Sequence, residues 1–159
     1  SATMSQPVFS RLIDDLCAAL GMVPANVAGT HFSFENDGFQ VTLRYPDQAA
    51  LAEPDAAMYL LIGFGVLPPG RTLQVFRLML EANLSVYAQD QAQLGLEPAS
   101  GEVVLIARVG LDADIHGDWL ADLVNHYIQH GRYWRDTIFA CTDEMYSALC
   151  TGDYLWIRA

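Results

Sequence analysis

Asp122, His126 and His130 are the residues whose types and spacing come closest to a chemical site. They lie four positions apart, so a helix would place their side chains in one row on one face. Two histidines at this spacing can bind zinc. However, no glutamate follows His126 to act as a general base, and the chain has no other clear ligand. We therefore expect an exposed polar row and no bound metal.

Two other patterns that can carry chemistry are incomplete. Cys17 lies beside an apolar helical stripe, whereas a thiol nucleophile needs a neighbouring base and an electropositive pocket. Gly63-Phe64-Gly65 lacks the third glycine and the following helix of a phosphate-binding loop. The cysteines are odd in number and have no paired spacing (Cys17, Cys141 and Cys150), which indicates reduced thiols in a cytoplasmic protein. No cofactor is expected.

Composition narrows the classes of partner. The chain has 159 residues, of which 52% are apolar and 17% charged, which suits one folded domain and excludes disorder. Its 19 acidic and 8 basic residues give a net charge of −11, which repels the phosphates of nucleic acids. A basic or largely unstructured polypeptide is a better partner. No apolar run is long enough to span a membrane, so no membrane partner is expected.

Residues 73–84 are predicted to form a helix with two apolar stripes on nearly opposite sides. The first stripe contains Leu73, Phe76, Leu80 and Leu84. The second stripe contains Val75, Leu78, Met79 and Ala82. A surface helix needs only one apolar face, so this one should be covered twice. We expect the first stripe to lie on the chain's own sheet and the second to pack against a second subunit, which predicts a homodimer.

Periodicity predicts the remaining elements. Helical spacing covers residues 9–20, and alternation on either side of Asn36-Asp37-Gly38 predicts a hairpin. An almost unbroken apolar run at residues 58–66 fits a central strand, with Gly63 and Gly65 marking a bulge or a close backbone approach. Two short strands, 91–97 and 102–108, and a long helix ending near Phe139 follow. This order predicts an α+β fold, α-β-β-β-α-β-β-α, with helices packed over an antiparallel sheet.

The expected domain organisation is simple. Residues 4–139 form a single α+β domain, and residues 140–159 form a C-terminal extension. Within that extension, residues 143–150 can form one more short helix packed on the domain.

Several short sequence segments, taken in their order along the chain, resemble the class I type III secretion chaperones, the Tir-chaperone-like family. They are Leu80-Glu81-Ala82-Asn83-Leu84, Gln93-Leu94-Gly95-Leu96-Glu97-Pro98, Gly101-Glu102-Val103-Val104-Leu105 and the helix from Trp119 towards Trp134-Arg135. The resemblance covers residues 5–139 and is most specific at 80–108. It implies a small acidic homodimer without enzymatic activity. Such a protein binds the N-terminal segment of a secreted effector in extended form and keeps it stable and ready for export.

The resemblance also assigns surfaces. It places the dimer interface on the helix 73–84 and the following hairpin, where we expect Val75, Leu78, Met79, Ala82, Asn83 and Leu94. It places effector binding on the first helix and the first three strands, where we expect apolar grooves and a sheet edge at Phe9, Leu12, Ile13, Phe32, Phe34 and Val41. The bound segment should be neutral or basic, because a surface of net charge −11 does not attract an acidic chain.

Two other functions stay open from the sequence. A small cytosolic hydrolase would use a metal at His126 and His130, or the thiol of Cys17, but no complete catalytic constellation is present. A structural subunit would dock its apolar helix into a larger complex. Self-complementary stripes favour the dimeric chaperone over the structural subunit.

Overall fold

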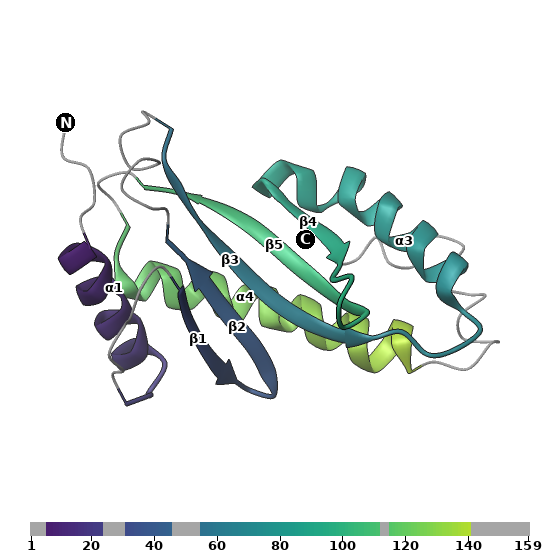
Figure 1. The fold of residues 1–159 in the computed structure, drawn as a ribbon, viewed down its shortest axis with the longest axis horizontal. Coiled ribbons are helices and arrows are strands. Elements are labelled where there is room, and N and C mark those ends of the chain that lie inside the picture. The colour runs from purple at the N-terminus through teal and green to yellow at the C-terminus, as the bar shows by residue number, and fades with distance from the viewer. Residues whose placement is uncertain (1–5, 24–30, 46–54, 112–114, 141–159) are drawn as a thin grey trace.

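The computed structural model describes residues 6–23, 31–45, 55–111 and 115–140 (Figure 1). Its elements, in chain order, are α1 (Gln6–Ala19), β1 (His31–Asn36), β2 (Phe39–Arg44), β3 (Ala57–Val66), α3 (Thr72–Ser85), the 3-10 turn η1 (Tyr87–Asp90), β4 (Ala92–Leu96), β5 (Glu102–Gly110) and α4 (Gly117–Tyr133). Helix α4 continues into a π-helical segment, η2 (Trp134–Phe139). The predicted order of helices and strands is therefore confirmed, with η1 as an additional short turn.

The sheet is antiparallel throughout and has five strands in the order β1-β2-β3-β5-β4. Strands β1 and β2 are joined by Asp37-Gly38, in which both residues have positive φ, 56° and 82°. Such two-residue turns match the twist of hairpin strands. In β3 the register shifts between Gly63 and Gly65, and a Cβ on Gly63 would lie 2.3 Å from a carboxylate oxygen of Glu102. Both the expected bulge and the expected close approach are present.

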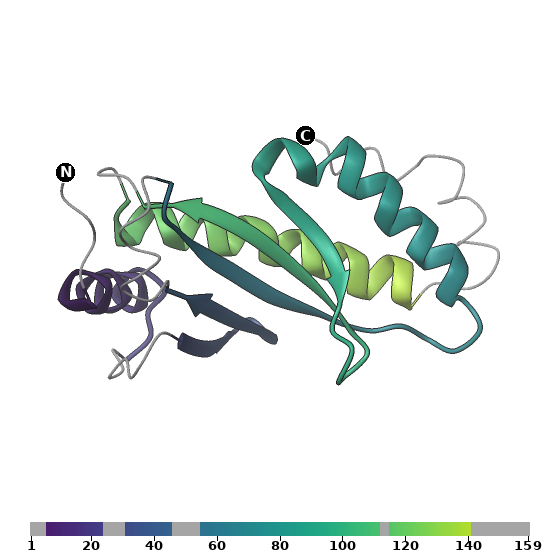
Figure 2. The same cartoon turned by 45° about the horizontal axis from the view of Figure 1, so that its top comes forward.

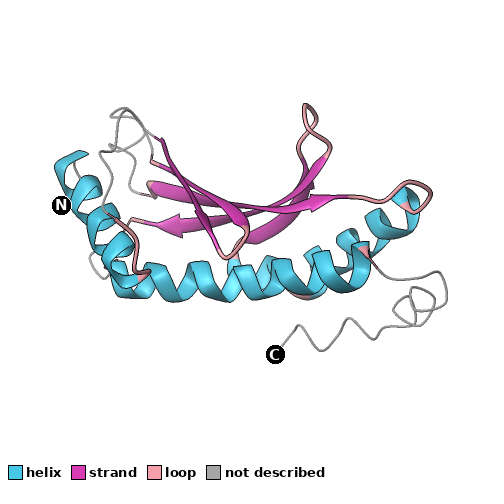
Figure 3. Ribbon diagram, turned by 90° about the horizontal axis from the view of Figure 1, so that it is seen from below, coloured by secondary structure: helices cyan, strands magenta, loops and turns pink. Residues whose placement is uncertain are grey.

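Helix α4 covers one face of the sheet, as Figure 3 shows from the side. Burial alternates along β5, where the buried side chains are Val103, Leu105, Ala107 and Val109. Gly131 lets α4 lie close to the strands, because a Cβ there would be 2.8 Å from the rings of Phe39 and Phe64. The core therefore lies between α4 and one face of the sheet, and no described helix covers the other face.

Helix α1 packs against the start of α4 at one end of the sheet. The two helices meet at Gly117, where a Cβ would be 2.5 Å from the Cβ of Asp15. Phe9 of α1 stacks on Tyr45 with 4.2 Å between ring centroids. At the far end of the sheet from α1, α3 lies beside the edge strand β4 (Figure 2).

Arg135 connects η2 to the β1–β2 hairpin and to the bulge in β3. Its guanidinium donates hydrogen bonds to the main-chain oxygens of Phe64 (2.9 Å), Gly38 (3.0 Å) and Gly63 (3.3 Å). It also lies 3.9 Å from the centroid of the Phe39 ring, a cation–π contact. The end of the long helix is therefore held by the sheet, and the helix does not break at Gly131. Residues 141–159, including the predicted short helix 143–150, lie outside the described residues.

Candidate protein-binding surfaces

Strand β1 offers an unpaired edge to a partner. The turn Asp37-Gly38 makes Asn36 and Phe39 a hydrogen-bonded pair, and pairing alternates along the hairpin from there. The main-chain N–H and C=O groups of Ser33 and Glu35 therefore point away from β2. No described strand lies on that side. An extended chain can add to the sheet here.

The other edge strand, β4, is closed at its centre by a side chain. The main-chain N–H of Leu94 donates to Asn83 Oδ1 at 2.7 Å, and Asn83 Nδ2 donates to the Leu94 carbonyl oxygen at 3.1 Å. The amide of Asn83 thus takes the place of a neighbouring strand. Such a contact protects an edge from pairing with another chain.

The sheet face away from α4 carries a mixed surface. Leu61 and Ile106, which are paired in register, are half-buried there, and Tyr59 is 37% exposed opposite Arg108. Nearer to β1, the hydroxyls of Ser33 and Thr42 are 2.9 Å apart and share a hydrogen bond. A strip of apolar groups bordered by polar ones suits contact with an extended polypeptide.

The two apolar stripes of α3 have roles opposite to those expected from the sequence. Val75, Leu78, Met79 and Ala82, expected at a dimer interface, are buried within the protomer. They pack beside β4 and η1, and Asn83 and Leu94 are engaged with each other. The opposite stripe is exposed instead: Leu73 by 81%, Leu80 by 70% and Leu84 by 81%. Both stripes are apolar, so periodicity alone did not distinguish the covered one from the open one.

The residues expected to line an effector groove are also buried. The exposed fractions of Phe9, Leu12, Ile13, Phe32, Phe34 and Val41 lie between 0% and 7%. These side chains fill the core under α1 and α4, so the expected groove along them is not open. Phe32 and Phe34, each 7% exposed, are the outermost of the set because they lie on the edge strand.

The expected exposed row on the last helix is wrong at His130. This side chain is 8% exposed, whereas Asp122 and His126 are exposed. Trp134 Nε1 donates to the Tyr87 hydroxyl at 2.9 Å, and the same hydroxyl lies 2.9 Å from His130 Nδ1. Because the Tyr87 hydroxyl accepts from Trp134, it donates its own proton to His130 Nδ1. Nδ1 is then an acceptor, so the proton of the neutral histidine is on Nε2. This Tyr87–His130–Trp134 network joins η1, α4 and η2.

Electrostatics keep this network neutral. Burial, and then the neighbouring His126, lower the pKa of His130 to about 4. Burial raises the pKa of Tyr87 well above its usual value. Burial, with a smaller effect of Asp90, raises the pKa of Tyr127 to about 12. At neutral pH Tyr87, Tyr127 and His130 therefore stay uncharged, and the hydrogen bonds of Tyr87 with His130 and Trp134 are kept.

The other residues considered for chemistry do not form a site in the described part of the chain. Cys17 is 1% exposed and packs in the core, while Cys141 and Cys150 lie outside the described residues. No three histidine, cysteine, aspartate or glutamate side chains among the described residues are arranged to hold a metal ion. Within the same residues, no helix has the length and apolar character needed to span a membrane.

Sequence reasoning missed the part that Asn83 plays inside the protomer. Asparagine is a poor helix former, and this one lies in a helix between two apolar stripes. That unfavourable placement was the available signal for a specific hydrogen bond. The partnership of Tyr87 with His130 and Trp134 had no such signal, because it depends on three elements that meet only in the fold.

The described residues thus form an antiparallel five-stranded sheet with a long helix across one face and an apolar helix beside an edge strand. The sequence matches the Tir chaperone protein (CesT) family over residues 11–135. The chain belongs to this family, which confirms the resemblance found in its sequence.

Solved structures share this fold. A chain of the ExsC–ExsE complex aligns with a TM-score of 0.66 at 17% identity, covering 84% of this chain and 96% of that one. A chain of the HopA1–SchA chaperone–effector complex aligns with a TM-score of 0.64 at 20% identity, covering 86% and 99%. A chain of the ExoT–SpcS complex from Pseudomonas aeruginosa aligns with a TM-score of 0.55 at 15% identity, covering 80% and 97%. The search of curated proteins returned no match to the chain.

Proposed function

We propose that this protein is a type III secretion chaperone of the cytoplasm that binds the N-terminal segment of a cognate effector in extended form. In this role it keeps the effector stable and competent for export. The observation that carries the proposal is the family match across residues 11–135. The shared fold with a chain of the HopA1–SchA chaperone–effector complex supports it. We propose no catalytic activity, since Cys17 is buried and His130 is a neutral, buried hydrogen-bonding group.

The outer edge of β1 is the proposed place where the effector main chain is held. A strand added there forms hydrogen bonds with Ser33 and Glu35, using main-chain groups that every sequence has. Its alternate side chains continue the apolar row of Phe32 and Phe34, which ends at this edge. The side chains of the added strand then determine which effector binds, while its main-chain hydrogen bonds supply much of the binding energy.

The exposed stripe of α3 is the proposed homodimer interface. Leu73, Leu80 and Leu84 are large apolar side chains with at least 70% of their surface exposed. Covering three leucines with a second copy contributes on the order of 5 kcal/mol before the costs of association. A dimer places two β1 edges in one particle, so a single effector segment can wrap around both.

Co-expression with candidate secreted proteins, followed by mass spectrometry of what copurifies, tests the proposal. We expect one partner, bound through roughly its first 100 residues, a length suited to a wrapped disordered segment. Ser33→Pro should lose this partner, because proline removes an outward N–H yet is tolerated on an edge strand. Ser33→Ala is the matched control and should retain it. Recovery of no secreted protein, or equal recovery with Ser33→Pro, would count against the proposal.

A further inference from the structure

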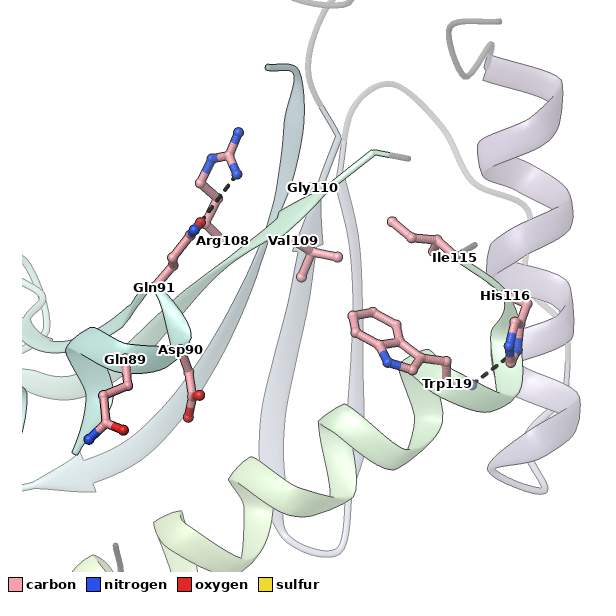
Figure 4. A pocket seen from close by; sticks show the side chains of 9 residues that line it. All are labelled: Gln89, Asp90, Gln91, Arg108, Val109, Gly110, Ile115, His116 and Trp119. Atoms are coloured by element: carbon pink, nitrogen blue, oxygen red, sulfur yellow. Dashed lines mark hydrogen bonds between the residues drawn. The ribbon is translucent and has the colours of Figure 1, made fainter. Parts of the chain in front are cut away.

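A groove opens where β5 continues past the beginning of β4 (Figure 4). Strand β4 begins at Ala92, opposite Ala107, whereas β5 runs on to Gly110. Two adjoining cavities, of about 710 and 280 Å³, fill the space between this end of β5 and helix α4. Asp90, Arg108 and Trp119 line both cavities, so they form one continuous groove.

Main-chain groups of β5 face this groove without a strand partner among the described residues. The N–H of Arg108 donates to the Gln91 carbonyl oxygen at 3.0 Å. The main-chain groups of Arg108 therefore point toward the β4 side of β5. The N–H of Gln91 donates to the Ala88 carbonyl oxygen and not to the carbonyl oxygen of Arg108. The C=O of Arg108 and, two residues on, the N–H and C=O of Gly110 therefore point to where β4 would continue.

The side chains around these groups combine an aromatic surface with a carboxylate. Trp119 is 43% exposed and lies beside Val109 (Figure 4). Its main-chain N–H donates to His116 Nδ1 at 3.3 Å. Asp90 lies across the groove from Trp119, and no described side chain forms an ion pair with it. Arg108 does not neutralise this acid, because its guanidinium turns away to the Gln91 side chain and the Asp55 carbonyl oxygen.

We propose that this groove binds a second extended segment of the secreted partner, which prolongs the line of β4 along the end of β5. The segment carries an apolar side chain against Trp119 and Val109 and a basic side chain against Asp90. Side chains two positions apart point the same way along a strand, so these two residues are separated by one. The charge of −11 favours a basic segment over an acidic one. This inference rests on the proposed function and adds a site on the side of the sheet opposite β1.

The test is an NMR titration of the full ¹⁵N-labelled chain with a short acetylated peptide of threonines carrying one leucine and one arginine two positions apart. We expect saturable shifts of the Gly110 amide and the Trp119 indole N–H. Asp90→Asn should weaken binding about fivefold, the effect of a partly exposed charge pair. The matched control Asp118→Asn, an exposed acid beside Trp119 that does not line the groove, should leave the affinity unchanged.

Several outcomes would overturn the inference. They are no shift at Gly110 with millimolar peptide, equal binding of a peptide with glutamate in place of arginine, or shifts confined to β1. Shifts at Gly110 that follow protein concentration without peptide would identify a second copy of the chain as the occupant. Ser33→Pro separates the two sites: it should abolish effector copurification through β1 and leave peptide binding at Gly110 intact. If the protein copurifies with its effector but the Gly110 amide does not shift with peptide, the groove is refuted and the proposed function is not.

Discussion

His130 contributes to stability through being neutral. Its Nδ1 accepts the Tyr87 proton only while the ring is uncharged, and burial is what lowers its pKa to about 4. An unfolded histidine has a pKa near 6.5. Between about pH 6.5 and 4 the unfolded chain therefore binds a proton at this position that the folded chain does not.

The consequence is a measurable loss of stability on acidification. The free energy of unfolding should fall as the pH drops from 7 to 5, with His130 contributing up to about 1.4 kcal/mol per pH unit below 6.5. His130→Gln should remove this contribution, because glutamine can accept the Tyr87 proton but does not titrate. His126→Gln, on the exposed face, is the control and should keep most of it, because burial and not His126 is the main cause of the lowered pKa of His130. Urea unfolding at each pH gives the comparison, and equal slopes for His130→Gln and the unmodified chain would contradict the assignment.

At the scale of elements, the hydrogen bonds between α3 and the edge of β4 come from one amide, that of Asn83. Asn83→Ala would leave the N–H and C=O of Leu94 without their partner on a strand edge. We expect a loss of about 1–3 kcal/mol in the free energy of unfolding and faster hydrogen exchange at the Leu94 amide. Asn125→Ala is the matched control, since it removes an exposed contact with Asn36 and should change stability by no more than about 0.5 kcal/mol. Unchanged exchange at Leu94 in Asn83→Ala would show that the edge is protected in another way.

Elements were also the scale at which sequence was most informative. Alternation at 31–36 and 39–44, the turn Asp37-Gly38 and the apolar run of β3 led to the correct strands, because each pattern reports local burial. The two stripes of α3 did not reveal their roles, since both are equally apolar and only the position of β4 decides between them. The expected groove at Phe9 is closed because this ring stacks on Tyr45, a contact between segments far apart in the sequence that no local pattern contains.

At the scale of the whole molecule, the exposed leucines of α3 make a sharp prediction about assembly. Leu80→Glu should give a folded monomer, because it places a charge on the exposed stripe where a second copy is proposed to pack. Met79→Glu should instead unfold the chain, because that side chain is 6% exposed and lies in the core. Light scattering at micromolar concentration and circular dichroism distinguish these results. A Leu80→Glu protein that remained dimeric would place the interface elsewhere.

The central claim is that the protein holds an effector segment in extended form along β1. Hydrogen–deuterium exchange on the copurified chaperone–effector complex tests it most directly, with the free chaperone as reference. The account predicts that the outward amides of Ser33 and Glu35 become protected on binding. It also predicts that the protected part of the effector is a continuous N-terminal segment. Unchanged exchange across β1 with the effector bound, or protection confined to a folded domain of the effector, would contradict it.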